Sequence, residues 1–427
     1  MNTAAATLAH PRMRGVDRFL RERLLARLVT LRHGRVQLND ALGTVTLGSS
    51  GTDGPSVRLE VTDAAFYRAV AAGGSVGAGE AYMDGLWRCS APGLDGSDAL
   101  VALVQLLVRN RDLLDGLESG WASVAGVMRR LWHAARRNSR TGSQRNIAAH
   151  YDLSNAFFAL FLSPDLLYSS AIWTGQGDTL EAASERKLES VCRKLGLTRS
   201  DHVLEIGGGW GGFALHAARH YGCRITTTTI SRQQYELARE RIRAAGLEER
   251  IELRLEDYRD LTGRYDKIVS IEMIEAVGAE HLEEYFATIG RLLAPHGTAL
   301  LQAITIEDHR YHQALESVDF IKRHVFPGSF IPSVSAMLAA KTRAGDLALV
   351  ALEDFGDSYA RTLKAWRKRF MARLEEVRAL GFDERFIRLW EFYLAYCEGG
   401  FRERALGVAH LKLVKPGWRH GARESSP

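Results

Sequence analysis

The pattern of apolar and polar positions indicates an α/β fold from Asp201 onward. Short runs of apolar and β-branched residues alternate there with stretches whose apolar residues recur at helical spacing. Such alternation predicts right-handed crossovers and a doubly wound, mostly parallel sheet. We expect strands at 202–206, 224–229, 250–255, 266–273 and 298–305, and helices at 211–221, 232–245 and 280–293.

The N-terminal part has a different pattern. Between Gly34 and Leu59, β-type residues alternate with Gly, Asp and Ser turns, which predicts small antiparallel strands, and helical patterns follow from about Asp63. Further on, the sequence becomes rich in Ser, Thr, Gly, Gln and Asn. We therefore expect a smaller N-terminal α+β domain at residues 1–138, a basic linker at 139–145 and a catalytic domain at 146–427.

Positive charge is concentrated near the N-terminus. The whole chain has a net charge of +5, whereas the first 150 residues carry 19 arginines, no lysine and 13 acidic residues. Arginine forks bind phosphate groups well, so a lipid head group or a nucleic acid is one interpretation and a solvated basic face is the other. Four arginines accompany an aromatic stripe at helical spacing, which fits either a segment on an anionic membrane or a helix packed on its own domain. They are Arg129, Arg130, Arg136 and Arg137.

The location of the protein follows from what the sequence lacks. No run of roughly 18 apolar residues occurs, and the start of the chain lacks the order of a signal peptide. The four cysteines are scattered and support neither a disulfide framework nor a zinc site. We expect a cytoplasmic protein without a bound metal that contacts the inner face of the membrane only peripherally.

A glycine-rich turn follows the first predicted strand of the α/β part. Glu205 precedes Gly207, Gly209 and Gly211, and in a doubly wound sheet this turn borders the ligand crevice. The carboxylate would repel a pyrophosphate but attract an ammonium group. S-adenosylmethionine has an amino acid end and no phosphate, so we expect it as the cofactor rather than a dinucleotide.

Three more residues suit this cofactor. The amide of Gln234 is able to bond ribose hydroxyls, Asp257 is able to accept from the adenine amino group, and Tyr258 is able to cover the ring. The alternatives are that Gln234 is an exposed helix residue and Tyr258 a packing residue.

The chain resembles the cyclopropane-fatty-acyl-phospholipid synthase family of S-adenosylmethionine-dependent methyltransferases from about Asn146 to Val414. The motifs are "HYDLSNAFFALFL", "LLYSSAIW", "YDKIVSIEMIEAVG", "VFPGSFIPS" and "FYLAYCEGGFRER", with "YMDGLW" in the N-terminal part. The resemblance implies a Rossmann-like methyltransferase fold, an N-terminal domain that engages phospholipid, and a homodimer. It assigns cofactor binding to Tyr168, Ser169, the Glu205–Gly211 loop, Thr229 to Gln234, Asp257 and Tyr258.

The resemblance also implies the reaction. The methyl group is transferred to a cis double bond of an unsaturated acyl chain in a membrane phospholipid, and a three-membered ring closes after a proton is lost. A bound bicarbonate ion accepts that proton, and the matching positions are Ser170, Glu275, Gln302, the backbone of Ile304, and Tyr359. Cys397 matches a cysteine sometimes treated as catalytic, although a buried apolar thiol is the interpretation that we favour.

Such a reaction needs an apolar site for the acyl chain that excludes water. The insertion from Glu307 to Ala340 and the aromatic stretch with Phe157, Phe158 and Phe161 are candidates for its lining. Ordinary core packing explains the three phenylalanines equally well.

Some positions differ from the best-known bacterial members of the family. Those members have Cys at the positions of Ser170 and Gly208, and His at the positions of Ala276 and Gln302. Neither Ser170 nor Gln302 carries a positive charge near neutral pH, which motivates an alternative: methylation without ring closure, giving a branched or furan fatty acid.

Two other classes of protein remain as alternatives. A nucleic-acid methyltransferase would suit the basic N-terminal part, but the chain lacks both an Asn-Pro-Pro-Tyr motif and a Pro-Cys nucleophile, so we expect no nucleic-acid partner. A lipid-binding protein without turnover would not need Glu275 and Tyr359.

Overall fold

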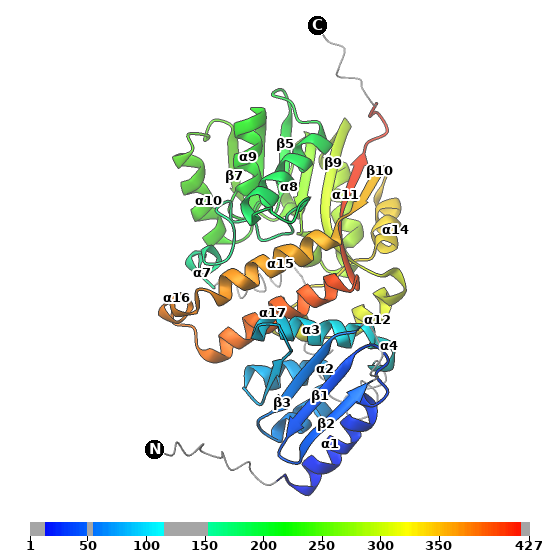
Figure 1. Ribbon diagram of the computed structural model, residues 1–427. Coiled ribbons are helices and arrows are strands. Elements are labelled where there is room, and N and C mark those ends of the chain that lie inside the picture. Colours follow the sequence, from blue (N-terminus) through cyan, green and yellow to red (C-terminus); the bar gives the residue numbers. More distant parts are fainter. Residues whose placement is uncertain (1–12, 49–53, 115–152, 420–427) are drawn as a thin grey trace. The chain divides into compact units, whose positions relative to one another are not determined.

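The computed structural model describes residues 13–48, 54–114 and 153–419 (Figure 1). The chain forms two compact units, one made of residues 1–131 and 374–403, the other of residues 132–373 and 404–427. The expected linker at 139–145 and the four arginines of the aromatic stripe lie outside the described residues. No helix in the described part of the chain has the length and apolar character that crossing a bilayer requires.

The N-terminal unit contains a four-stranded sheet in the order β2-β1-β3-β4. Its strands are β1 (Arg35–Asp40), β2 (Gly43–Gly48), β3 (Ser56–Val61) and β4 (Trp87–Ser90). The β1–β2 and β3–β4 pairs are antiparallel, as the sequence predicts, but β1 and β3 are parallel. The purely antiparallel expectation is wrong here because the β1–β2 hairpin brings the chain back to the start of β1. The next strand, β3, pairs along the free edge of β1 and therefore runs in the same direction as β1.

Helices cover this small sheet. They are α1 (Gly15–Leu28), α2 (Ala65–Met83), α3 (Gly96–Arg109) and α4 (Arg111–Leu114). Asp95 caps α3 by accepting from the backbone N–H of Asp98. The α3 helix buries a continuous apolar stretch that includes Leu100, Leu103 and Leu106.

Two C-terminal helices belong to the same unit, although the sequence analysis assigned them to the catalytic domain. They are α16 (Leu374–Ala379) and α17 (Glu384–Arg402). The α17 helix packs against α2 and α3, and Tyr82 Oη donates to Glu391 Oε2 at 2.8 Å. A Cβ atom on Gly399 would lie 2.5 Å from Val104 Cγ1, so the glycine permits the close contact between α17 and α3.

The second unit has a seven-stranded sheet in the order β10-β11-β9-β8-β5-β6-β7. Its strands are β5 (His202–Ile206), β6 (Arg224–Thr229), β7 (Ile251–Leu255), β8 (Tyr265–Ile271), β9 (Leu293–Ile306), β10 (Ala348–Asp354) and β11 (Leu406–Val414). The strands β7, β6, β5, β8 and β9 are parallel, whereas β11 pairs antiparallel with both β9 and β10. This confirms the doubly wound, mostly parallel fold.

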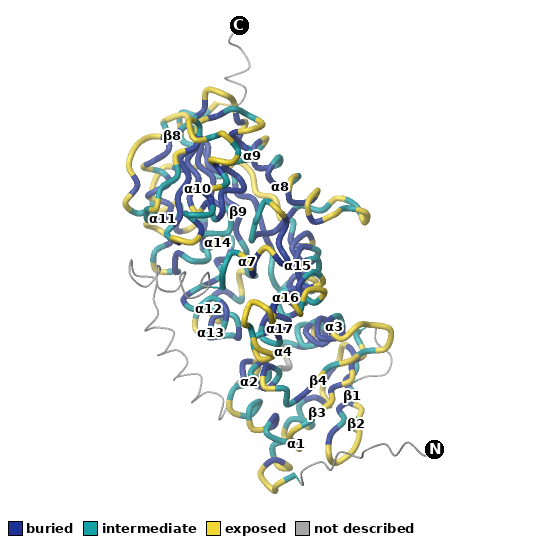
Figure 2. The backbone as a smooth tube through the Cα atoms, turned by 90° about the vertical axis from the view of Figure 1, so that its left-hand side faces the viewer, coloured by how far each residue is buried: buried dark blue, intermediate teal, exposed yellow. Residues whose placement is uncertain are grey.

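Helices cover both faces of this sheet. They are α7 (Asn155–Ala159), α8 (Leu180–Leu195), α9 (Gly212–Tyr221), α10 (Arg232–Ala244), α11 (Leu282–Leu292), α12 (Tyr311–Glu316), α13 (Phe320–His324), α14 (Val334–Ala344) and α15 (Gly356–Met371). One apolar core joins α8, α9 and α10 to the sheet, and another joins α11 and α14 to it. Figure 2 shows the strands between them as largely buried.

The topology fixes where a ligand site lies. The order of strands reverses at β5, because β6 and β7 lie on one side of it and β8 and β9 on the other. Ligands of doubly wound sheets bind at such a switch point, beyond the carboxyl ends of the strands. Glu205, Thr229, Asp257 and Glu275 lie at or shortly beyond the carboxyl ends of β5, β6, β7 and β8, and Gln302 lies in the C-terminal half of β9.

Candidate active site

The glycine turn lies between β5 and α9. Gly207 has a φ of +81°, a conformation that side chains disfavour, and its backbone N–H bonds Thr228 O at 3.1 Å. A Cβ atom on Gly209 would meet nothing within 4 Å, so open space adjoins the turn at that point. The turn therefore offers bare backbone to a ligand.

Glu205 lies directly beneath this turn. The residue is 3% exposed, and Thr227 Oγ1 donates to its Oε2 at 2.6 Å. Burial raises the pKa of Glu205 to about 7, while the Thr227 bond and the charge of Lys187 oppose the rise. A Cβ atom on Gly208 would lie 2.0 Å from Thr227 Oγ1 and 2.8 Å from Glu205 Oε2. Only glycine fits at 208 beside this pair.

A buried lysine lies near Glu205 and two other carboxylates. Lys187 of α8 has no exposed area, and its Nζ donates to Ser169 Oγ at 2.8 Å. Burial lowers its pKa to about 8, and attraction to Glu272, Asp165 and Glu205 limits the fall. We did not predict this residue from the sequence. The available signal was a lysine in the apolar periodicity of α8, between Ala183 and Val191.

The centre of the polar cluster is Glu272, which the sequence analysis missed. Its Oε1 accepts from the backbone N–H of Ser170 at 2.8 Å and from Gln302 Nε2 at 2.7 Å, and its Oε2 accepts from Tyr359 Oη at 2.8 Å. Burial raises its pKa, and these three donors oppose the rise. The signal in the sequence was a carboxylate directly after a buried strand. The structure thus brings Ser170, Gln302 and Tyr359 together around one carboxylate.

Glu275 lies one short turn further on. Its Oε1 accepts from the backbone N–H of Ile304 at 2.6 Å, while its Oε2 is buried without a hydrogen-bond partner among the described residues. Burial and the charge of Glu272 raise the pKa of Glu275 to about 8. Near neutral pH, Glu275 is therefore largely protonated, and it lies beside Glu272, whose two oxygens together accept three hydrogen bonds. The backbone N–H of Phe330, in the 307–340 insertion, donates to Glu275 O at 3.1 Å. This bond attaches the insertion to the short turn that carries Glu275.

A second chain of contacts holds Gln302. His410 of β11 lies opposite Gln302 in the β9–β11 ladder, and its Nε2 is 3.0 Å from Gln302 Oε1. Lys194 Nζ lies 2.7 Å from His410 Nδ1 and forms an ion pair with Glu353. Burial and the charges of Lys194 and Lys187 lower the pKa of His410 to about 2, so the ring is neutral. A histidine is thus present next to position 302, on the neighbouring strand.

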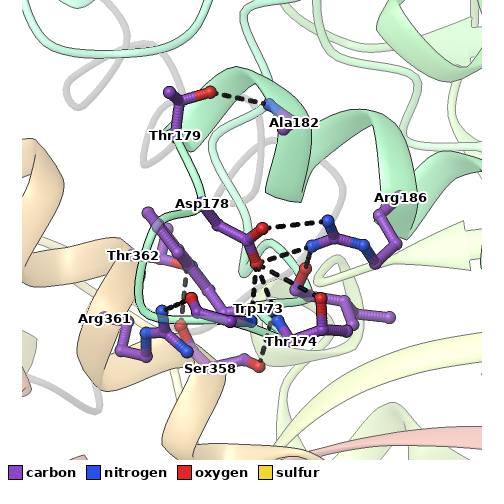
Figure 3. A network of polar contacts seen from close by, with 11 residues as sticks. Trp173, Thr174, Asp178, Thr179, Ala182, Arg186, Ser358, Arg361 and Thr362 are labelled. Carbon is purple, nitrogen blue, oxygen red and sulfur yellow. Dashed lines mark hydrogen bonds and ion pairs between the residues drawn. The ribbon is translucent and has the colours of Figure 1, made fainter.

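Ser169 and Ser170 lie on a segment that is tied to α15, the helix that carries Tyr359. The backbone N–H groups of Ala171 and Trp173 donate to Thr362 Oγ1 and Ser358 Oγ at 3.1 and 3.0 Å, and Trp173 Nε1 donates to Thr362 Oγ1 at 2.9 Å. Figure 3 shows the bonds from Trp173 to Ser358 and Thr362. This network fixes the distance between Ser170 and Tyr359.

Asp178 stabilises the conformation of the same segment. Its carboxylate accepts from the backbone N–H groups of Thr174 and Gly175 and from both terminal nitrogens of Arg186 (Figure 3). These bonds, the Gly175 bond foremost, lower the pKa of Asp178 well below its usual value. Asp178 therefore stays ionised and keeps the segment in one conformation.

Tyr168 is part of an aromatic cluster. Its ring centroid lies 5.3 Å from those of Phe158 and Trp366 and 6.2 Å from that of Phe326 in the insertion. Phe157, Phe158 and Phe161 have no exposed area and contact one another, so they form core that supports Tyr168. Core packing therefore explains these three phenylalanines.

The remaining predicted cofactor residues lie beyond β6 and β7. Thr229 Oγ1 donates to Gln234 Oε1 at 2.8 Å, and both side chains are buried. Asp257 accepts three bonds from Arg259 through both carboxylate oxygens, so an adenine amino group would have to share this acceptor. The Tyr258 ring packs edge-on against Tyr285 with centroids 5.6 Å apart.

Cys397 belongs to the other compact unit of the chain. It lies on α17 in the N-terminal unit, whereas the other predicted catalytic residues lie in the second unit.

The cofactor expected from the sequence fits these residues. Glu205 Oε1 has no protein partner among the described residues, and the bare turn with open space at Gly209 lies beside it. An acidic group next to exposed backbone suits the ammonium and carboxylate of an amino acid end, whereas it would repel a pyrophosphate. Glu205 and the turn would hold that end, with Thr229 and Gln234 at the next strand.

Comparison with solved structures defines the class of protein. A mycolic acid cyclopropane synthase, CmaA1, in complex with SAH and CTAB superposes with a TM-score of 0.60 at 27% identity, covering 64% of this chain and 98% of that one. Coclaurine N-methyltransferase with SAH matches in fold, with a TM-score of 0.59 at 21% identity, covering 79% of this chain and 98% of that one. The protein is an S-adenosylmethionine-dependent methyltransferase.

Sequence comparison then gives the family. The mycolic acid cyclopropane synthetase family model matches residues 138–411, and the chain belongs to this family. It is 38% identical to the tuberculostearic acid methyltransferase UfaA1 of Mycobacterium tuberculosis, over 92% of this chain and 91% of that protein. It is 34% identical to cyclopropane-fatty-acyl-phospholipid synthase of Escherichia coli K12, over 86% of this chain and 89% of that protein.

Proposed function

We propose that this methyltransferase acts on a cis double bond of an unsaturated acyl chain in a membrane phospholipid and forms a cyclopropane ring. When bound, S-adenosylmethionine supplies an electrophilic methyl group. An alkene that accepts a methyl cation becomes positively charged, so its substrate site needs a group that removes a proton from carbon. The observation that supports the proposal is the pair Glu272 and Glu275 at the carboxyl ends of the strands, beside the glycine turn.

The residues around this pair support the same chemistry. Tyr359 Oη is held by Glu272, and the phenol ring is able to stabilise nearby positive charge through its face. Trp366, with a centroid 6.1 Å from that of Tyr359, and Tyr168 add aromatic surface that excludes water. The resemblance implies bicarbonate as proton acceptor at this cluster, and Glu275 and Ile304 would then contact it.

Methylation without ring closure is a second candidate, favoured by one specific observation. The relative with 38% identity is called a tuberculostearic acid methyltransferase rather than a cyclopropane synthase. Fungal sphingolipid C9-methyltransferases are related as well, at 32% identity for that of Emericella nidulans, over 65% of this chain and 55% of that protein. In this alternative the proton is lost without ring closure, and the product is a branched acyl chain.

We also propose that the protein is cytoplasmic and docks peripherally, as a homodimer, on an anionic membrane surface. The N-terminal excess of arginine supports this, because each basic residue near an anionic surface contributes about 1 kcal/mol of attraction.

Expression in a bacterium without its own cyclopropane synthase tests the function. We expect phospholipid acyl chains heavier by one CH2 in mass spectra, and upfield ring-methylene signals in proton NMR. A branched product without those signals would select the second candidate. Unchanged phospholipids, together with methyl transfer from labelled cofactor to RNA or DNA, would contradict both.

A further inference from the structure

Glu272 has an unusual backbone conformation for its residue type. Its φ is +48°, in the left-handed region that favours glycine. Such strain persists only where the surroundings hold the residue firmly, and it is concentrated at functional sites. Here the backbone N–H of Glu272 donates to Gln302 O at 2.8 Å, and its side chain accepts the three bonds described above.

The donors around Glu272 form a complete anion site. Ser170 N–H, Gln302 Nε2 and Tyr359 Oη come from three different elements and converge on one carboxylate. These residues are three of the five positions that the resemblance assigns to bicarbonate. The fourth, the backbone N–H of Ile304, donates to Glu275, which is the fifth.

A separate bicarbonate ion fits this arrangement poorly. A carboxylate and bicarbonate present the same pair of oxygens, so Glu272 and the ion would compete for the same donors. An additional anion would also stand beside Glu272 and Glu205, for which Lys187 is the buried counter-charge. Repulsion in a buried site makes that combination costly.

We propose that the Glu272 carboxylate takes the place of bicarbonate as the base that removes the proton from the methylated acyl chain. This inference rests on the function proposed above. A carboxylate offers about four lone-pair positions, and three are occupied, which leaves one on Oε2 beside the Tyr359 hydroxyl. The C–H bond breaks, its electron pair forms the new carbon–carbon bond, and the proton goes to Oε2.

The test begins with the unaltered protein in buffer freed of carbon dioxide, with S-adenosylmethionine and vesicles of a cis-unsaturated phosphatidylglycerol. We expect the same rate with and without added bicarbonate. A rate that collapses on depletion and returns with bicarbonate would overturn the inference while leaving the proposed function intact. A protein that never alkylates these vesicles would instead contradict the proposed function.

Two variants make the test sharper. Glu272→Gly removes the carboxylate at a backbone position that suits glycine, and it leaves a space lined by the same three donors. We expect its rate to fall by about 100-fold or more and to recover on addition of bicarbonate, formate or acetate. Glu272→Gln fills the space with a neutral amide, so we expect a similar loss without recovery. A Glu272→Gln variant with the unaltered rate would overturn the inference.

A binding measurement gives a readout independent of turnover. Carbon-13 NMR of labelled bicarbonate should show binding to the Glu272→Gly variant and none to the unaltered protein. The matched control is Glu280→Gln, an exposed carboxylate near the same turn, which should behave as the unaltered protein in every assay. Saturable bicarbonate binding to the unaltered protein would contradict the inference.

Discussion

His410 Nε2 lies 3.0 Å from Gln302 Oε1, directly across the β9–β11 ladder. Lys194 has only donor hydrogens, so His410 Nδ1 accepts from it and the ring proton is on Nε2. The Gln302 carbonyl therefore accepts from His410, and its amide nitrogen is directed to Glu272, 2.7 Å away. His410 is a positioning residue that sets the orientation of a donor to the proposed base.

Replacement of His410 by Ala should therefore lower kcat by about tenfold while the KM for S-adenosylmethionine stays nearly constant. The reason is that a buried acceptor on Gln302 loses its partner, at a cost of roughly 1–3 kcal/mol, and the amide is free to turn. Steady-state kinetics measure both parameters. His309→Ala, at an exposed position, is the control. An unchanged kcat, or a change in KM alone, would argue against this role.

Replacement of Glu205 by Gln should weaken cofactor binding. The charge-assisted bond to the ammonium group of the cofactor is lost, which we expect to raise Kd by about 10- to 100-fold. Calorimetry with S-adenosylhomocysteine measures the effect, with the exposed Glu249→Gln as control. Equal affinity in the two variants would remove Glu205 from the cofactor site.

Gly208 and Thr227 should show strong coupling. Gly208→Ala places a methyl group against Thr227 Oγ1 and breaks its bond to Glu205, so we expect a loss of roughly 1–3 kcal/mol in the free energy of unfolding. Thr227→Ala removes the obstacle. The double variant should therefore be more stable than the sum of the two single effects predicts, as measured by urea unfolding. Additive effects would show that the steric argument is wrong.

The raised pKa of Glu275 makes a prediction about stability and pH. Its ordinary pKa is 4.5 and the folded protein raises it to about 8, so between these values the folded state binds the additional proton. The contribution of Glu275 to the free energy of unfolding is fully present below about pH 4.5 and is lost as the pH rises through about 8. The groups around its carboxyl are the Ile304 N–H, Tyr285, and Glu272 with Lys187 beyond it.

Glu275→Gln lacks this dependence. From about pH 5 to about pH 8.5, the variant should gain roughly 4 kcal/mol over the unaltered protein in the free energy of unfolding by urea. Glu280→Gln should track the unaltered protein. Parallel curves for all three proteins would contradict the assigned pKa.

The sequence predicts most of the central sheet because its signals are local. Strands and helices alternate with distinct periodicities from β5 to β9, and the glycine turn with Glu205 lies within a few residues. The edge strand β10 is mostly exposed and has no alternating pattern, so periodicity does not reveal it. The placement of α17 with the N-terminal unit depends on packing against α2 and α3, which no local pattern encodes.

The sequence also predicts part of the site, because some of its residues belong to local motifs. Ser170, Gln302 and Tyr359 match motif positions, but their common partner Glu272 becomes visible only when three separate elements meet. Gln302 and His410 are 108 residues apart in the chain, and their contact follows from strand register. Lys187 is buried against carboxylates from other elements, and its sequence neighbours do not reveal this.

The most direct test of the account uses purified protein, S-adenosylmethionine with a deuterated methyl group, and two sets of vesicles. One set carries cis-unsaturated acyl chains and the other saturated chains with the same head group. We expect label in the acyl chains of the unsaturated lipid alone, with one deuteron of the methyl group lost as the ring closes. Label in the head groups, or equal labelling of the saturated vesicles, would contradict alkylation of a double bond at this site.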